Sequence, residues 1–479
     1  MHTPFFPSLR PRLAALGQRV QQVRPQSLAH LEQLVQPQLP AGMLAQADAG
    51  TNSRERVYSV RRTFFGFLYQ VLNPECSCRQ VVRQVQALFA LHDQGRVDEG
   101  TSAYCQARRR LPLALLQRLR MTLAAAGEKT ADRWHDLRPK ILDATTLSLP
   151  DTPENQQAYP QSRGQKPGCG FPLLKLVGVF SLHTGQLLTY AKGNKHDHDL
   201  GLWRRLLKQF QAGDVVLADR GFCSYVVMAL WLGRHVHSLL RLHKSRPGDL
   251  RKGRRLGKND RLLIWPKPNQ KPCWLPLAWW RKLPAQLTVR LVRFNLHRPG
   301  YRTIAVTLVT TLLDPQRYPA RELAELYARR WQIELWFRDI KTSMGMEVLR
   351  CKTPAMVQKE LEMFLIGYNF IRSLMREAAT TNDVPLGRIS FKGAVDALRQ
   401  FSLAIAQARS KKKQNQLRNQ LLEVLARDLV PDRPGRSEPR AIKRRPKSYQ
   451  RLNRPRHLMK VVSHRNHRHN NKNHANNGL

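Results

Sequence analysis

The chain has 479 residues, and its 81 lysines and arginines outnumber its 34 aspartates and glutamates, which gives a formal net charge of +47. An apolar share of 42% is that of a globular protein with a sizeable core, and the charge predicts a polyanionic partner such as nucleic acid. No apolar run reaches eighteen residues and residues 1–20 lack the apolar core of a secretory signal, so we expect a cytoplasmic protein with no membrane partner.

Residues 1–130 carry helical periodicity interrupted by proline and glycine, with helix signals at 63–72 and 111–126. Between these signals, 101–110 offers a capping Ser or Thr, a short helix and a basic triplet, Arg108 to Arg110. The triplet either binds backbone phosphates or forms a solvated basic face, and the pattern favours neither. We expect a helical N-terminal domain that binds DNA.

The seven cysteines are scattered and include no paired C-x-x-C motif. Two of them, Cys76 and Cys78, are one residue apart, and no second pair stands at the spacing that a zinc site uses. An odd number of cysteines in this arrangement predicts reduced thiols.

The pattern changes at Pro139, where 140–146 predicts a short buried strand that ends on Asp143. Strands at 173–181 and 186–191 and a helix at 199–210 follow. A second buried strand at 213–218 is followed directly by Asp219. Each acid alone is an ordinary turn residue, but two acids at strand ends predict an α/β sheet with a site at its edge.

The segment from His196 to Asp199 reads His-Asp-His-Asp and resembles a metal cluster at first sight. Adjacent residues on a loop rarely converge on one ion, so we expect a polar loop whose last residues cap the following helix.

Between 244 and 320 the alternation of helices and strands is interrupted by a basic loop at 245–260 and by strand patterns at 262–265, 287–294 and 303–312. This predicts a β-rich insertion. Its tryptophans are expected in the core when each is considered alone. They are Trp265, Trp274, Trp279 and Trp280.

In 327–341, Tyr327, Arg330, Glu334 and Lys341 are spaced by three, four and seven residues, which on an α-helix places them within roughly 60° of one another. Apolar neighbours on the same side predict that this stripe is covered. One reading is a ladder of salt bridges. The other makes Glu334 a metal ligand beside groups that hold phosphates, and with Asp143 and Asp219 it would supply the three carboxylates that Mg²⁺ prefers.

After 350, helices at 356–378 and 393–406 are expected to pack behind the sheet. From 436 to 479 there are thirteen lysines or arginines and one acid, Glu438, together with many asparagines and histidines. This composition predicts a tail that is disordered until it meets nucleic acid.

The order Asp143, Asp219, Glu334, with the Y-x2-R-x3-E-x6-K spacing around Glu334, resembles the DDE transposases of the insertion-sequence-4 family over residues 100–375. The likeness includes Asp219-Arg220-Gly221-Phe222, Arg330-Trp331-Gln-Ile-Glu334 and Arg350-x-Lys352-Thr353. After the second acid some relatives read Arg-Glu-Ala-Asp, whereas this chain reads Arg220-Gly221-Phe222. Contacts that those relatives make at these positions are therefore not assigned to this chain, except at Arg220.

The resemblance implies a ribonuclease-H-like core in which Asp143, Asp219 and Glu334 bind two Mg²⁺ ions, with Mn²⁺ as a substitute. It further implies that the following residues contact DNA: Tyr327, Arg330, Lys341, Arg220 and Trp331. An insertion tryptophan would stack on an unpaired base, at about 1 to 3 kcal/mol per stacked base. The expected partners are the terminal inverted repeats of an element and target DNA, bound by a homodimer.

The sequence thus predicts an α/β fold: a ribonuclease-H-like mixed sheet with flanking helices and a β-rich insertion, a helical N-terminal domain and a disordered basic tail. The expected divisions are 1–130, the core at 131–243 and 321–430, the insertion at 244–320 and the tail at 431–479. The expected activity is cut-and-paste DNA transposition by a nucleoid-associated enzyme. The alternatives are an inactive relic that only binds DNA and a nuclease of the same fold.

Overall fold

The computed structural model describes Val35, 43–46 and 57–431 apart from 92, 94, 130, 244, 247, 297–303 and 409, together with 454, 455, 458 and 459. Most of the predicted tail and the first part of the N-terminal region lie outside the described residues. Within the described part, every helix is too short or too polar to cross a lipid bilayer. All seven cysteines are free thiols, as predicted.

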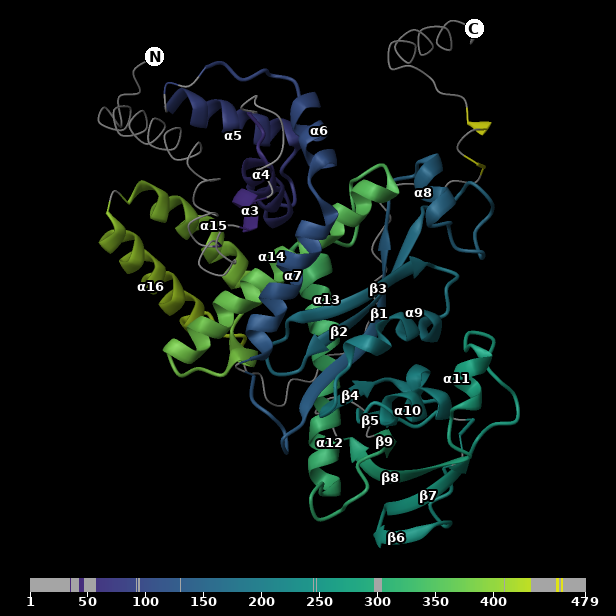
Figure 1. The fold of residues 1–479 in the computed structure, drawn as a ribbon. Helices are drawn as coiled ribbons and strands as arrows, with labels where there is room; N and C mark the ends of the chain where they lie inside the picture. Colours follow the sequence, from purple (N-terminus) through teal and green to yellow (C-terminus); the bar gives the residue numbers. More distant parts are fainter. Residues whose placement is uncertain are drawn as a thin grey trace, which may run out of the picture.

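One mixed sheet organises the molecule, in the strand order β3-β2-β1-β4-β5-β9-β8-β7-β6 (Figure 1). Strands β1, β4 and β5 are parallel to one another, and the other neighbouring pairs are antiparallel. The strands are β1 Arg138–Ser148, β2 Leu173–Ser181, β3 Leu187–Asn194, β4 Asp214–Ala218, β5 His237–Arg241, β6 Arg254–Gly257, β7 Asp260–Pro266, β8 Gln286–Leu296 and β9 Ile304–Thr310.

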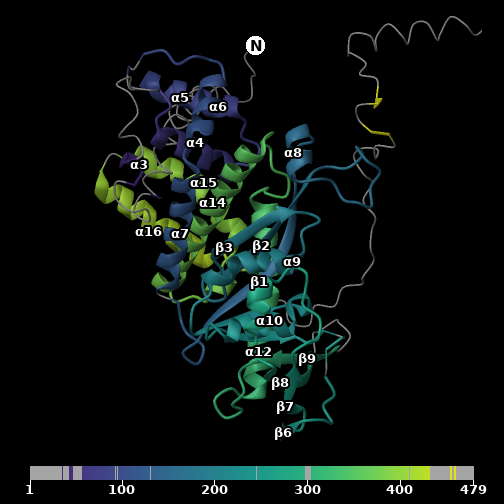
Figure 2. The same cartoon turned by 45° about the vertical axis from the view of Figure 1, so that its right-hand side comes forward.

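Alternating side chains bury both faces of the central strands. In β4, Val215 and Leu217 belong to one hydrophobic cluster, while Val216 and Ala218 belong to another on the opposite face. Because strand side chains alternate with a period of two, this run of four apolar residues predicts a strand covered on both sides. Figures 1 and 2 show the helices that cover the two faces.

The first face is covered by helices from both ends of the chain. Helix α14, Pro354–Thr381, has 28 residues and packs against α4, α7 and α16, so these N-terminal and C-terminal helices share one core with the sheet. The helices on this side and at the adjoining end are α3 Met43–Gln46, α4 Val60–Leu72, α5 Cys78–Leu91, α6 Ser102–Arg110, α7 Leu113–Glu128, α12 Ala320–Ala328, α13 Gln332–Arg338, α15 Phe391–Gln407 and α16 Lys411–Arg427.

The second face is covered by α9, Asp199–Leu206, and α10, Tyr225–Leu232. Helix α9 begins as the sequence predicted, because the His198 side chain accepts a hydrogen bond from the Leu200 amide and Asp199 stands in the first turn. The interpretation of His196 to Asp199 as a polar capping loop is therefore confirmed.

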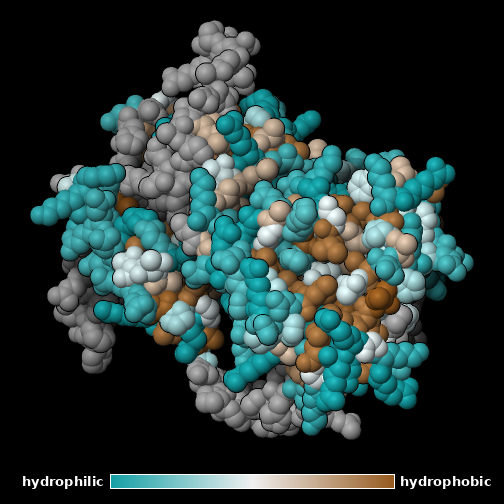
Figure 3. Space-filling view, turned by 60° about the horizontal axis from the view of Figure 1, so that its bottom comes forward, coloured by the Kyte–Doolittle hydropathy of each residue, from teal (hydrophilic) through white to brown (hydrophobic). Residues whose placement is uncertain are grey.

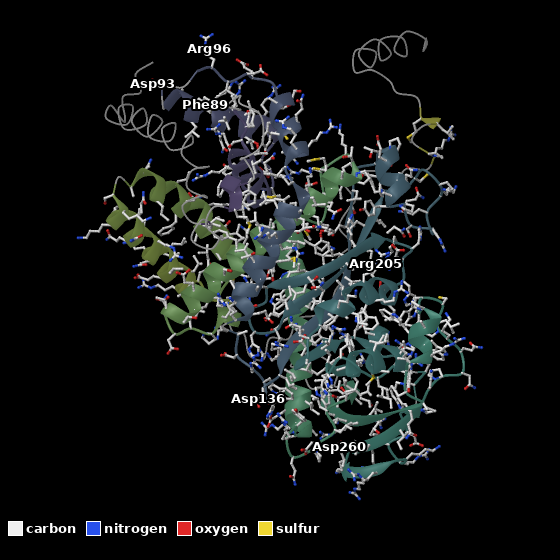
Figure 4. The ribbon with its side chains drawn as sticks, in the orientation of Figure 1. Phe89, Asp93, Arg96, Asp136, Arg205 and Asp260 are labelled. Atoms are coloured by element: carbon white, nitrogen blue, oxygen red, sulfur yellow. The ribbon has the colours of Figure 1, made fainter. Side chains whose placement is uncertain are left out.

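Strands β6 to β9 continue the central sheet. The predicted loop at 245–260 was wrong in part, since it contains β6, which pairs with β7. A buried ion pair anchors these strands: the Arg290 Nε and Nη2 atoms lie 2.9 and 2.6 Å from the two oxygens of Asp260, which Figure 4 labels near the lower end of the molecule. Arg290 also donates to the carbonyls of Asp314 and Tyr318, which tie this region to the segment before α12.

The edge strand β3 has two of its carbonyls occupied by arginines. Arg120 of α7 donates to the Leu188 carbonyl at 3.1 Å, and Arg205 of α9, labelled in Figure 4, donates to the Lys192 carbonyl at 3.0 Å. These donors satisfy groups that an open edge would offer to another strand.

The basic triplet at the end of α6 divides between the interior and the surface. Arg108 is buried, with its guanidinium 3.9 Å from the Phe67 ring centroid and 3.2 Å from the sulfurs of Cys78 and Cys351. Arg109 and Arg110 are exposed. Neither interpretation of the whole triplet holds, because the helix turns its first arginine inward.

The surface seen in Figure 3 is largely hydrophilic around one large apolar area, as the charge leads one to expect.

Candidate active site

Three charged residues stand in one row on the parallel strands. The register pairs Leu142 with Ala218 and Ala218 with Leu240, so the next residues on β1, β4 and β5 are Asp143, Asp219 and Arg241. Two residues before each of them, Ile141, Leu217 and Leu239 all belong to the first hydrophobic cluster. Because side chains alternate along a strand, this places the row on the face that α12 and α13 cover.

The position of Asp143 corrects one prediction. Strand β1 does not end there but continues to Ser148, because β2 pairs with it as far as Ser148 opposite Leu173. Only the parallel partner β4 ends at this level, and Asp219 then caps a short 3-10 turn by accepting a hydrogen bond from the Gly221 amide at 2.8 Å. Asp143 accepts one from the Ala144 amide, also at 2.8 Å.

The segment carrying Glu334 is not the single regular helix that the sequence predicted. Helix α12 ends at Ala328, residues 329–331 form a 3-10 turn, α13 follows, and 339–343 form a π turn. Each residue of a 3-10 turn rotates the chain by about 120° and not 100°, so three of them shift Glu334 by about 60° relative to Tyr327.

This rotation changes which of the four side chains is covered. Tyr327 and Arg330 are buried, and the Lys341 side chain is 22% exposed. The Glu334 side chain is 50% exposed, so the prediction of a covered carboxylate was wrong. Lys341 lies 3.7 Å from Glu347, not next to Glu334.

Arg330 lies between the strand acids and the helix acid. Its Nη1 atom is 4.0 Å from the Asp143 Oδ2 atom, and its Nη2 atom is 3.7 Å from the Glu334 Oε1 atom. The guanidinium also lies 5.0 Å from the Trp331 ring centroid. Its Nε atom is buried without a hydrogen-bond acceptor among the described residues, which is an uncommon state for a charged donor. One more anionic oxygen would satisfy it.

The electrostatics of the site reflect burial and neighbouring charges. Burial raises the pKa of Asp143 to about 6; the Ala144 amide and Arg330 oppose this shift, and Asp219 and Glu334 add to it. Burial also raises the pKa of Tyr327 to about 12, so its hydroxyl remains a donor and bonds to the Ala218 carbonyl at 3.3 Å. Asp219 and Glu334 are therefore close enough to Asp143 to influence its ionisation.

A pocket of about 270 Å³ opens beside the row of charges. It combines three arginines with three aromatic rings, and its lining residues are Asp219, Arg220, Arg241, Phe294, Val306, Tyr327, Ala328, Arg330 and Trp331. The structure thus brings together Asp219 and four of the five predicted DNA contacts, while Lys341 lies outside. Sequence reasoning missed Arg241 and Phe294, although Arg241 follows an apolar strand just as Asp219 does.

None of the insertion tryptophans lines this pocket. Trp265 is buried in the second hydrophobic cluster, and Trp274, Trp279 and Trp280 are partly buried against it. The core interpretation therefore describes Trp265, and the rings beside the charged row are those of Phe294, Tyr327 and Trp331.

The donor chemistry suits a divalent metal ion, since carboxylate oxygens are the ligands that hard cations prefer. Asp219 and Glu334 add to the cost of ionising Asp143, and a cation bound beside Asp143 would reduce that cost. Within the described residues, however, no three such side chains lie close enough together to hold one ion. In this arrangement the Arg330 guanidinium lies between Asp143 and Glu334.

Comparison with known proteins decides the family. Residues 134–370, which contain the row on the sheet and the segment with Glu334, match the model of the transposase DDE domain. The chain belongs to the DDE transposases. It is 26% identical over 439 residues to the transposase InsG of insertion sequence element IS4 from Escherichia coli K12, covering 88% of this chain and 93% of that relative.

A second relative is the transposase of insertion sequence element IS231F from Bacillus thuringiensis subsp. israelensis, 22% identical over 49% of this chain and 54% of that protein. A piggyBac transposase in a synaptic complex with hairpin DNA superimposes with a TM-score of 0.40 at 10% identity, covering 86% of each chain, which is too distant to support an argument.

The predicted insertion-sequence-4 likeness, the ribonuclease-H-like fold class and the assignment as an enzyme of DNA transposition are confirmed. This transposase family generally uses a divalent metal ion. The alternative of an inactive relic or a plain nuclease is not favoured.

Proposed function

We propose that Asp143, Asp219 and Glu334 are the metal-binding acids with which this transposase cuts the ends of its element and joins them to target DNA. The observation that carries the proposal is the parallel register, which places Asp143 and Asp219 side by side under the helical segment of Glu334, with Arg330 between the two groups. Partly buried carboxylates placed side by side are costly unless they bind a cation or a substrate.

The arginines of the pocket hold the phosphates next to the cleaved bond. Arg330 offers a buried Nε donor that lacks an acceptor within the described chain, and Arg220 and Arg241 line the same pocket. An arginine binds a phosphate through two parallel hydrogen bonds, which fixes its orientation as well as its charge. Tyr327 and Trp331 form aromatic walls of this pocket. Lys341, which lies outside the pocket, contacts the DNA strand beyond it.

The bound cofactor is proposed to be a pair of Mg²⁺ ions, with Mn²⁺ as a substitute. Such a pair activates the attacking oxygen and stabilises the leaving oxygen of a phosphodiester. The residues of the chain orient the phosphate: Arg330 and Arg241 fix it against Asp219, while the aromatic walls of the pocket exclude water.

The remaining parts of the proposal concern DNA and assembly. Two copies of the transposase bind a pair of terminal inverted repeats before cutting, in the cytoplasm and on the nucleoid. The core comprises 131–243 and 321–430, and the insertion comprises 244–320. DNA outside the core is bound by residues 1–130 and by the basic tail at 431–479. The net charge of +47 supports binding to several DNA segments at once.

The test is Mg²⁺-dependent cleavage of a plasmid that carries the inverted repeats flanking the gene, with the full-length chain and its Glu334→Gln variant. Cleavage at the repeat ends that disappears in Glu334→Gln supports the triad and the reaction together. Binding of the ends without cleavage by the wild type contradicts the proposed activity, and cutting without rejoined product contradicts strand transfer.

A further inference from the structure

A second polar hollow, of about 810 Å³, lies outside the site described above. It is formed by helix α8, Pro153–Ala158, and the loop that leads to β2. Seven of its ten lining residues carry polar side chains, and the lining is Asp151, Thr152, Pro153, Gln156, Gln161, Ser162, Arg163, Gln165, Pro167 and Gly168. The proposed function gives this hollow no role.

Two glutamines fix the shape of the hollow from within. The Gln156 side chain donates to the Asp151 carboxylate at 2.8 Å and to the Gly170 carbonyl at 2.9 Å. The Gln161 side chain donates to the carbonyls of Gln165 and Lys166 and accepts from the Gly170 amide. A surface loop with this much internal bonding is preorganised for binding.

The side chains of Arg163 and Gln165 are exposed at the hollow, and for neither does the described part of the chain show a hydrogen bond from the side chain. In this they differ from Gln156 and Gln161, whose side-chain amides form hydrogen bonds within the loop. The hollow therefore presents the Arg163 guanidinium and the Gln165 amide at its surface, with the Gln165 amide oxygen lying against the Gly170 backbone.

The hollow is joined to the active site through the segment that follows Lys341. Lys341 lies 3.7 Å from Glu347, whose carbonyl accepts a hydrogen bond from the Ser148 amide at the end of β1. The Thr152 hydroxyl then donates to the Lys352 carbonyl at 2.7 Å. The five steps along the strand from Asp143 to Ser148 span about 16 Å, which corresponds to about five base pairs of duplex DNA.

The chemistry of the two sites differs in a way that indicates a division of work. The active-site pocket collects three arginines, the side chains that bind phosphates and position DNA. The hollow instead presents an amide and a single guanidinium among hydroxyls, other amides and the Asp151 carboxylate, which Gln156 holds by a hydrogen bond. Glutamine pairs with adenine and arginine with guanine through two hydrogen bonds each in the major groove, so such groups read sequence.

We propose that the hollow at 151–168 reads base edges of the element end about five base pairs from the cleaved bond, with Arg163 and Gln165 as the reading side chains. The inference rests on the proposed function, because it takes the cleaved phosphate to lie at Asp143. It assigns part of the end specificity of the transposase to the catalytic core itself.

The experiment measures the affinity of the full-length chain for two duplexes by fluorescence anisotropy in Ca²⁺, without cleavage. One duplex carries the terminal repeat, and the other has transversions at the first ten base pairs inside the cleavage site. Gln165→Ala and Arg163→Ala are compared with Arg427→Ala, which removes one exposed positive charge from α16 on the opposite side of the molecule from α8 (Figure 1).

The loop variants should lower the ratio of the two affinities by roughly 5- to 150-fold, the value of one bidentate base contact. Gln165→Ala should do so without weakening the transverted duplex, because it removes no charge. A 7-deazapurine at the contacted base should weaken the wild type and leave the matching variant unaffected. Arg427→Ala should keep the ratio.

An unchanged ratio in both loop variants, or an equal loss on both duplexes, overturns the inference. Its failure is distinct from failure of the proposed function, since a wild type that discriminates and cleaves in Mg²⁺ would retain the proposed triad. Thermal unfolding checks the fold, and because both side chains are exposed the midpoints should match the wild type.

Discussion

The two halves of the acidic site are held in different ways. Asp143 stands on β1 and Asp219 directly follows the neighbouring parallel strand β4, so the register of the two strands fixes how far apart these positions are. Glu334 stands on a short helix between a 3-10 turn and a π turn, with half of its side chain in solvent. A hydrogen-bonded sheet allows little adjustment, whereas irregular helical turns are a common place for movement at functional sites. The strand acids therefore define the position of the site, and the helix acid adapts to it.

The largest expected effect on cleavage comes from changing the length of an acidic side chain by one methylene. Asp143→Glu should lose at least about a hundredfold in cleavage rate, because β1 is held by pairing on both sides and the longer side chain misplaces the carboxylate. Glu334→Asp should lose about tenfold, because its segment can approach and restore most of the geometry. The measurement is single-turnover cleavage of repeat-end DNA, with end binding as the control. Equal losses in both variants would break the comparison.

Arg330 connects the two halves, and Arg330→Gln should weaken end binding by about 10- to 150-fold, the range for a hydrogen bond to a charged group. The slope of log affinity against log salt should become shallower by about 0.9 for each phosphate that the variant no longer neutralises. Titrations between about 50 and 200 mM salt check this, with Arg427→Gln as the matched removal of one charge. A slope that stays the same would place Arg330 away from DNA.

The stability of the protein should also depend on pH through Asp143. Burial raises the pKa of Asp143 to about 6 in the folded protein, so ionised Asp143 destabilises the metal-free protein above that pH and this penalty is lost as pH falls toward 4. Asp143→Asn should therefore stabilise by about 1 to 3 kcal/mol at pH 8 and by little at pH 4.5. Urea unfolding in EDTA measures it, and Glu334→Gln should stay within about 0.5 kcal/mol at both pH values.

The smallest effect is expected at Tyr327, whose hydroxyl bonds to the Ala218 carbonyl just before Asp219. Tyr327→Phe should lower the free energy of unfolding by about 0.5 to 1.5 kcal/mol. Because this bond ties the helical segment to the sheet, the variant should also move Glu334. Denaturant unfolding and cleavage are measured together, and a loss of stability without any change in cleavage would show that the segment is positioned by packing alone.

Local patterns were enough to predict much of this molecule. Strand β2 and the starts of β4 and α9 follow from apolar runs, caps and turns that lie within a few residues of each element. The acids and the Y-x2-R-x3-E-x6-K spacing are local as well, and they pointed to Asp143, Asp219 and Glu334 as neighbours. In the fold, Asp219 and Glu334 both contribute to the raised pKa of Asp143, while the roles of the three acids stay a prediction.

What the sequence missed depends on partners far along the chain. The end of β1 at Ser148 is set by pairing with β2 and with Val348, and β6 exists because β7 accepts it. Arg241 enters the site only through the register of β4 with β5. The exposure of Glu334 follows from a 3-10 turn that helical periodicity does not reveal.

The pairing of β5 with β9 has a consequence for solubility. Strand β5 is the last parallel strand, and β9 occupies the edge that it would otherwise present. A shortened chain that lacked β6 to β9 would expose the edge of β5, with its row of unpaired amides and carbonyls. The apolar residues of β5 on the two faces of the sheet would lie next to this edge. Such a chain would associate through that edge with other copies of itself, so the inserted strands protect the transposase from aggregation.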